Sequence, residues 1–517
     1  MPLALTVSAL VVATAGNGSA AVSGPAAVSL FAAKGAAVSK PLNANGPIAV
    51  GVPDLNLPGA KQAGGVDLHL RAGKTQRMTE QKLGLVGSGK GDFHRFGASV
   101  IADYVNRDKY PDLVVGAPGL AAKGAKGRVV LLFGSAKGIT AKGAQVLSAG
   151  EAGDEFGASV VMSQGVLYVG APGHDVGGVA NAGGLYRYSF SAKGKASAID
   201  LLTQSLPALG GVAQANQRFG EVLAAREVLT TKDDGVVIGL PNARVGTAAG
   251  AGEMIRLTVD PTTAAFTAEI WTQDSPGVPD TAEAGDHFGA AITTDGYAVG
   301  VPGEDVDGPA VGAPGEVAGA IANAGAVQTF IRVPSADSGG EDYAFVPSRL
   351  LTQADPKIPG QAEAGDRFGA ALTRGIFVAQ EAITMAIGAP GEDVGTVTNA
   401  GSVTLVGLLR TVDDESSGPP QLLSQGHGLP GTSETGDALG ASLGMIFGDG
   451  GLEEDRYDTL LIGLPGEDVG TTKAHRNAGR AILWSYRPAP PQKKAFGYSG
   501  GDLPGLRYGT VFATDAR

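Results

Sequence analysis

The chain contains no cysteine, few aromatic residues and a deficit of positive charge. Without cysteine it can form no disulfide, no thiolate zinc site and no cysteine nucleophile. Aromatic residues make up 6% of its 517 residues, so a core must be built from Val, Ile, Leu and Ala. The formal net charge of −12 argues against nucleic acid as a partner, because binding to phosphates depends on Lys and Arg.

Long hydrophobic runs are also missing after the N-terminal segment, so no transmembrane segment is expected. The 82 glycines indicate many tight turns. Between them lie short apolar runs such as Leu113–Val115 and Leu460–Ile462, which end in Gly and Pro. Such runs are typical of strands that are covered on both faces. The sequence therefore predicts an all-β fold.

Two motifs recur seven times each along the chain. The first is Phe-Gly or a looser copy, at Phe96, Phe156, Phe219, Phe288, Phe368, Leu439 and Tyr508. The second is Gly-Ala-Pro or Gly-x-Pro, beginning at Gly51, Gly116, Gly170, Gly239, Gly300, Gly388 and Gly463. A recurrence of this kind indicates radially arranged or stacked supersecondary units.

The order of the motifs suggests a closed ring. The first Gly-Val-Pro has no Phe-Gly before it, and the last Tyr-Gly has no Gly-Ala-Pro after it. We therefore expect seven four-stranded blades, the last of which is closed by N- and C-terminal strands. Such closure leaves no open sheet edge to recruit another chain, so a monomer is expected.

The motifs resemble the FG-GAP repeat of the integrin alpha-chain head and of related bacterial secreted proteins. The resemblance covers roughly residues 47–515 and implies a seven-bladed β-propeller that serves adhesion or ligand recognition. We assign residues 46–517 to this propeller.

Residues 1–21 contain the apolar run Leu3–Ala13 followed by small residues, as in a secretory signal, and predict an extracellular protein; a disordered Ala-rich tail is the alternative. Residues 22–45 are rich in Ala, Ser and Gly and predict a linker.

Acidic residues recur at fixed places within the repeat. A turn such as Glu283-Ala-Gly-Asp286 precedes the Phe-Gly, and Gly-Glu-Asp follows several Gly-x-Pro copies, before Asn-Ala-Gly. Asp in such turns can bind local backbone amides, so a structural role is one interpretation. The other is an acidic rim that binds cations or a basic partner. The rim candidates are Asp175, Glu304, Asp305, Glu392, Asp393, Glu467 and Asp468.

One blade retains part of a calcium loop. Integrin-type blades carry alternating oxygen ligands between Phe-Gly and Gly-Ala-Pro, and the resemblance implies calcium ligands at Asp103, Asn106, Asp108 and Asp112. Tyr104 occupies the first ligand position, and Lys109 replaces the turn glycine. The alternative is a hairpin that has lost its ligands.

Motifs for catalysis are weak. Gly497-Tyr-Ser-Gly-Gly501 matches a nucleophile elbow, but a turn is expected there rather than a strand followed by a helix. No catalytic residue is therefore assigned. The first hypothesis is a secreted, non-enzymatic propeller that binds a protein or glycan at one rim. The alternatives are an extracellular hydrolase or lyase with carboxylates in the central funnel, and a propeller that supports a larger surface assembly.

Overall fold

The computed structural model describes residues 28–32, 48–70, 74–87, 90–119, 124–225, 235–259, 266–294, 306–334, 343–378, 383–408, 419–446, 457–468, 479–485, 496–499 and 511–512. These residues contain no α-helix, and a single turn of 3-10 helix lies at Pro207–Leu209. No helix within these ranges has the length and apolar character that crossing a membrane requires.

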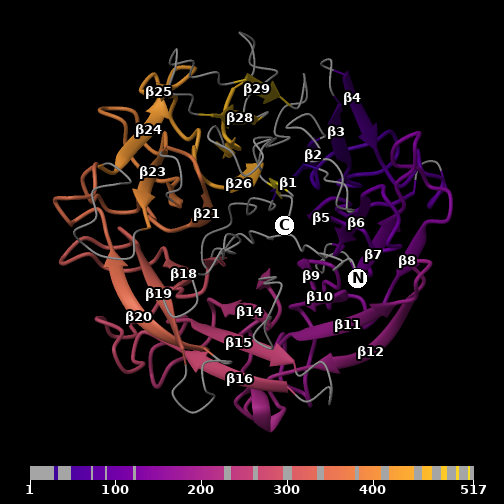
Figure 1. Cartoon of the computed structure of the whole chain (residues 1–517), viewed down its shortest axis with the longest axis horizontal. Helices are drawn as coiled ribbons and strands as arrows, with labels where there is room; N and C mark the ends of the chain where they lie inside the picture. Colours follow the sequence, from indigo (N-terminus) through magenta and orange to yellow (C-terminus); the bar gives the residue numbers. More distant parts are fainter. Residues whose placement is uncertain are drawn as a thin grey trace.

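The strands form seven sheets that are arranged radially, so the protein is a seven-bladed β-propeller (Figure 1). We number the blades from the first one that is continuous in sequence. Blades 1 to 3 consist of β5 (Ser99–Asp103), β6 (Asp112–Ala117), β7 (Arg128–Leu132) and β8 (Gln145–Leu147); β9 (Val160–Ser163), β10 (Val166–Ala171), β11 (Gly184–Phe190) and β12 (Ala196–Leu202); and β13 (Val222–Ala225), β14 (Gly235–Leu240), β15 (Glu253–Val259) and β16 (Phe266–Trp271).

The remaining four blades have four or five strands. Blades 4 to 6 consist of β17 (Ala291–Thr293), β18 (Val306–Ala313), β19 (Ala326–Pro334) and β20 (Tyr343–Leu351); β21 (Ala371–Gly375), β22 (Thr384–Ala389), β23 (Ser402–Gly407), β24 (Gln421–Gln425) and β25 (Gly428–Leu429); and β26 (Leu443–Ile446), β27 (Thr459–Leu464), β28 (Arg480–Trp484) and β29 (Phe496–Ser499). Blade 7 consists of β1 (Val28–Ala32), β2 (Ile48–Gly51), β3 (Val66–Leu70), β4 (Lys74–Met78) and β30 (Val511–Phe512). The expected four strands per blade therefore hold for five blades, and blades 5 and 7 have five.

Blade 7 contains strands from both ends of the sequence. β30 pairs with β2 in antiparallel orientation and with β1 in parallel orientation. β1 lies inside the segment 22–45 for which the composition predicts a linker. Closure of the ring by the two termini stays a prediction, as does the division of the chain into signal, linker and propeller.

The apolar runs Leu113–Val115 and Leu460–Ile462 form strands, as expected, and lie in β6 and β27, the second strands of their blades. Every residue of β6 and of β22 is buried, because neighbouring blades cover both faces of each sheet. The innermost strands β1, β5, β9, β13, β17, β21 and β26 contact one another around the ring. The core therefore consists of the layers between blades rather than one central cluster.

The recurring motifs form the contacts between blades, which we call seams. The motif residues Phe96, Phe156, Phe219, Phe288, Phe368 and Leu439 are all buried at a seam. The N–H of Phe219 donates to the carbonyl of Ala182 in the preceding blade at 2.9 Å, and Phe288, Phe368 and Leu439 repeat this bond. A Cβ on Gly388 would lie 2.0 Å from the carbonyl oxygen of Gly440, so a side chain there would collide with the next blade. The motif glycines are thus required by close approach of two backbones.

Blade 4 corrects one assignment made from the sequence. We took Gly300-Val301-Pro302 as its Gly-x-Pro copy, although a second copy, Gly312-Ala313-Pro314, follows 12 residues later. In the structure, Gly312 is at the end of β18, pairs with Ala291 and accepts the N–H of Gly289 at 3.0 Å. Gly116 accepts the N–H of Gly97 in the same way in blade 1. Gly300 to Asp305, and with them the rim candidates Glu304 and Asp305, lie outside the described residues.

Candidate functional site

Two acidic segments of the repeat lie at the same end of the blade in blades 4, 5 and 6. The Glu-x-Gly-Asp turn precedes the innermost strand, and the loop containing Gly-Glu follows the second strand. These two strands are antiparallel, so the start of one lies beside the end of the other. Segments about 30 residues apart in the sequence are thereby brought together.

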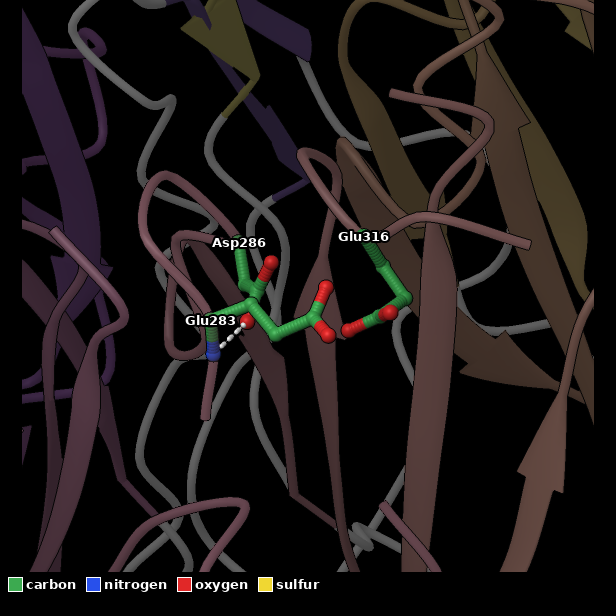
Figure 2. Close-up of side chains that lie close together, drawn as sticks. All are labelled: Glu283, Asp286 and Glu316. Carbon is green, nitrogen blue, oxygen red and sulfur yellow. Dashed lines mark hydrogen bonds between the residues drawn. The ribbon is translucent and has the colours of Figure 1, made fainter. Parts of the chain in front are cut away.

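Backbone contacts fix the two segments in blade 4. The N–H of Glu283 donates to the Asp286 carboxylate at 2.5 Å and closes the turn, as Figure 2 shows. The N–H of Gly315 donates to the Asp286 carbonyl at 3.0 Å. A Cβ on Gly315 would lie 1.8 Å from the carbonyl oxygen of Gly285, so glycine is needed for this approach. Glu316 is consequently held beside Asp286.

Glu283, Asp286 and Glu316 form a triad in which one carboxylate oxygen from each residue lies within 4.8 Å of those of the other two (Figure 2). Among the described residues, no other group of three or more Asp, Glu, His or Cys side chains converges so closely. Asp286 and Glu316 are buried, whereas Glu283 is exposed and connects the triad with solvent.

Burial and mutual repulsion disfavour ionisation of the triad. Burial, followed by the charges of Glu283 and Asp280, raises the pKa of Asp286 to about 6. Burial, followed by the charges of Asp286 and Asp280, raises the pKa of Glu316 to about 7. A cation held between these carboxylates would remove the repulsion.

A glutamine from the preceding blade completes the surroundings of the triad. The Nε2 of Gln273, just after β16, donates to the Glu316 carboxylate at 2.5 Å. Gln273 is 2% exposed, and its Oε1 has no hydrogen-bond partner. A buried carbonyl oxygen without a partner is an unsatisfied acceptor.

Blades 5 and 6 repeat the arrangement, with one difference. Their counterparts of the triad are Glu363, Asp366 and Glu392, next to Gln353, and Glu434, Asp437 and Glu467, next to Gln425. In blade 6, Arg480 lies 2.8 Å from the Glu467 carboxylate. In blade 2, His174 replaces this glutamate and bonds Asp154 at 2.9 Å. Two seams therefore place a basic side chain beside the acids.

The rim candidates that are described divide into two kinds. Glu392 and Glu467 are each 6% exposed and accept hydrogen bonds from Gln353 and Gln425, so they face the seam rather than solvent. Asp175 accepts the backbone N–H of Asn181 at 2.8 Å.

Asp393 accepts the N–H of Asn399 at the same distance as Asp175 does that of Asn181. Asp468 is partly exposed. These two bonds fit the turn-forming interpretation of Asp175 and Asp393, and an acidic rim that includes the two residues stays a prediction.

The residues of the predicted calcium loop bond to one another and to nearby backbone N–H groups. The Nδ2 of Asn106 donates to Asp108, and the Asp108 carboxylate also accepts the N–H of Tyr110 at 2.7 Å. Asp112 accepts the N–H groups of Asn106 and Gly134, at 3.1 and 2.8 Å. The donors are therefore engaged with each other and with the backbone, which fits a self-stabilised hairpin better than a prepared cation site.

The first residue of that loop is separate from the others. Asp103, at the end of β5, accepts the N–H of Tyr104 at 2.6 Å. Burial raises the pKa values of Asp103 and Asp112 to about 7. Asp103, Asp108 and Asp112 do not converge within 4.8 Å as the triad does. Calcium binding at this hairpin stays a prediction.

Comparison with known proteins gives no family. No protein-family model and no curated protein matches this chain. Among solved structures, a protein from Lactobacillus plantarum is similar with a TM-score of 0.39 and 9% identity, over 95% of this chain and 99% of that one. The likeness carries no argument about function, so the FG-GAP resemblance and what it implies stay predictions.

The triad itself was not predicted as a site. The sequence does show the Glu-x-Gly-Asp turn and the Gly-Glu pair as recurring units, but it does not show that they meet. The distance from Gly-x-Pro to Asn-Ala-Gly would have identified the correct copy in blade 4. Asn181 follows Gly170 by 11 residues, Asn399 follows Gly388 by 11, and Asn323 follows Gly312 by 11. That spacing selects Glu316, rather than Glu304, as the counterpart of Glu392.

Proposed function

We propose that this protein is an exported, monomeric and non-enzymatic binding module that recognises its ligand at one face of the propeller. The observation that carries this proposal is the composition of the central channel. The described innermost strands contain two titratable residues, Asp103 and Arg374. Arg374 is engaged with the carbonyl of Gly308 at 2.7 Å. A hydrolase or lyase in the funnel would need a pair of acids that these strands do not supply.

The face that we propose for binding is defined by one exposed glutamate from each of four blades. These glutamates begin the Glu-x-Gly-Asp turns, and we call their surface the acidic face; they are Glu151, Glu283, Glu363 and Glu434. The seam bonds between successive blades keep the turns at the same end of the ring. Together with a net charge of −12, this surface favours a basic protein segment as ligand over a neutral glycan.

A rigid frame supports recognition by such a face. Backbone contacts at the seams hold each turn in place, so its side chains lose little conformational freedom when a ligand binds. The ligand would thus meet a charge array that is already in position. Electrostatic steering of a basic partner would increase the association rate at low ionic strength.

A binding screen against proteins and glycans tests the proposal. We expect the screen to yield basic protein ligands whose affinity falls as salt rises from 50 to 500 mM, roughly tenfold or more for several charge pairs. Changing Glu151, Glu283, Glu363 and Glu434 together to Gln should weaken binding at least tenfold. Asp108→Asn, which removes an exposed acid at the opposite end of blade 1, is the matched control.

Two results would contradict the proposal. One is unchanged affinity of the fourfold variant for every ligand found. The other is turnover in esterase, glycosidase or lyase assays that a single carboxylate substitution such as Asp103→Asn abolishes. The second outcome would support the funnel enzyme instead.

A further inference from the structure

We propose that Glu283, Asp286 and Glu316 bind a calcium ion in the seam between blades 3 and 4. The three carboxylates come from two loops of blade 4 and converge within 4.8 Å (Figure 2). Backbone bonds to Asp286 from Glu283 and Gly315 hold both loops before any ion arrives. The exposed side chain of Glu283 provides the entry path from solvent.

Gln273 gives an observation independent of the acids. It lies on the other side of the seam, is 2% exposed, and directs its amide group at Glu316. Its Oε1 has no partner. In the seam between blades 2 and 3, the corresponding Gln204 is satisfied at both atoms, because Nε2 donates to Glu253 and Oε1 accepts from Gln217. Gln353 and Gln425, the counterparts in the next two seams, leave Oε1 without a partner as Gln273 does. What distinguishes blade 4 among the described residues is the close convergence of three carboxylates beside that oxygen.

That carbonyl oxygen suits a cation. Turning the amide group about its terminal bond would place Oε1 beside the Glu316 carboxylate. Two oxygen acceptors in such proximity repel each other unless a cation lies between them. With an ion present, Gln273 would supply a fourth protein oxygen to the three carboxylates.

Blade 6 shows how the same cluster is neutralised by the protein itself. Ala326, Ser402 and Arg480 are the first residues of β19, β23 and β28, and each pairs with the last residue of the strand before it. Arg480 therefore occupies the position of Ala326 in blade 4, and its guanidinium contacts Glu467, the counterpart of Glu316. Ala326 has no charge, so this position does not compensate the negative charge of Glu316 in blade 4. A bound cation would supply the missing positive charge.

The ligand chemistry selects calcium among the common divalent ions. All the ligands are oxygen atoms, three of them carboxylates, and no described His or Cys joins the group. Hard cations prefer such ligands, whereas zinc prefers nitrogen and sulfur. The ligands come from loops and an amide group in irregular positions, which calcium tolerates and magnesium does not. Affinities of extracellular calcium modules lie at about 10⁻⁴ to 10⁻³ M, so millimolar calcium should fill the site.

Equilibrium binding of ⁴⁵Ca²⁺ to the full chain, after removal of metal with a chelator, tests the site. We expect Glu316→Gln to weaken binding at this site at least tenfold. Ala326→Arg, which imitates blade 6, should have the same effect by placing a guanidinium in the seam. Calcium at 10 mM should raise the Tm of the unchanged chain by roughly 1–2 °C and leave that of Glu316→Gln unaltered.

Two controls keep the result specific. Glu467→Gln changes the counterpart that already has Arg480, so calcium binding should stay as in the unchanged chain. Asp112→Asn tests the hairpin of β5 and β6 and should also leave the blade 4 site intact. Calcium binding that disappears in Asp112→Asn and persists in Glu316→Gln would overturn the proposal, as would the absence of binding to the unchanged chain. Glu316→Gln preserves the size of the side chain, so we expect this variant to fold. Its Tm without calcium verifies the folding separately.

Discussion

At the scale of single residues, most of the recurring sequence serves the seams. The motif glycines are positions where a Cβ would penetrate the neighbouring blade, and the motif phenylalanines fill the space beside them. Asp175 and Asp393, which the sequence offered as either turn formers or rim ligands, bind backbone amides. A residue repeated in many blades is therefore explained first by the contact that every blade makes.

Gly312→Ala tests the corrected register of blade 4. The added Cβ would lie 2.0 Å from the carbonyl oxygen of Gly369, so the seam between blades 4 and 5 must open. We expect a loss of about 1–3 kcal/mol in the free energy of unfolding, measured with urea. Gly87→Ala is the control, because the nearest atom to its Cβ is 3.8 Å away on the flexible side chain of Lys90. Equal stability of the two variants would argue against this role of Gly312.

Glu253 makes stability dependent on pH. Burial raises its pKa to about 7, against a smaller opposing effect of the hydrogen bond from Gln204. The folded chain thus binds the proton on the Glu253 carboxyl more tightly than the unfolded chain does. The stabilisation that this protonation contributes is complete below the unfolded pKa of about 4.5 and is lost as pH rises through 7. Glu253→Gln should therefore stabilise the protein by about 1–3 kcal/mol at pH 8 and have little effect at pH 4. Thermal unfolding at both pH values measures this difference, and an equal effect at both would contradict it.

At the scale of strands and loops, the prediction succeeded where the repeat is regular. The two motifs located the innermost and second strands of most blades, because their glycines and phenylalanines are constrained by backbone contact. It failed at blade 4, where two Gly-x-Pro copies compete within 12 residues, from Gly300 to Gly312, and the pairing of β17 with β18 decides between them. The meeting of Asp286 with Glu316 could not be predicted, because it depends on antiparallel pairing across 30 residues.

Asp393→Ala tests the loop that follows β22. Its carboxylate accepts the N–H of Asn399, whose φ of 50° is unusual for a residue other than glycine. Loss of this bond should cost about 0.5–1.5 kcal/mol, measured by urea unfolding. Asp393→Asn keeps an acceptor oxygen and should recover most of that loss. If Asp393→Ala instead weakens ligand binding without changing stability, the rim interpretation is correct for this residue.

At the scale of the whole molecule, the seams make the ring a set of layers that depend on one another. In five seams, those before blades 1, 3, 4, 5 and 6, a backbone bond joins the Phe-Gly turn or its Leu-Gly copy to a loop of the preceding blade. The innermost strands contact one another around the ring, including β26 with β1. The acidic loops are carried at one end of this frame. Recognition at that end and ion binding inside a seam share Glu283 but otherwise use different residues, so Glu316→Gln should remove ion binding while the four glutamates of the acidic face remain.

Removal of β30 tests closure by the two termini. β30 provides pairing for both β1 and β2, so a chain that ends at Gly509 should expose unpaired backbone groups of blade 7. We expect a lower Tm and concentration-dependent association in light scattering, because an exposed strand edge recruits another chain. A chain that ends at Phe512 keeps β30 and should behave as the full chain does. If the shorter chain matches the longer one in both Tm and oligomeric state, the ring does not depend on the C-terminal strand, and the contact of β26 with β1 is sufficient to close it.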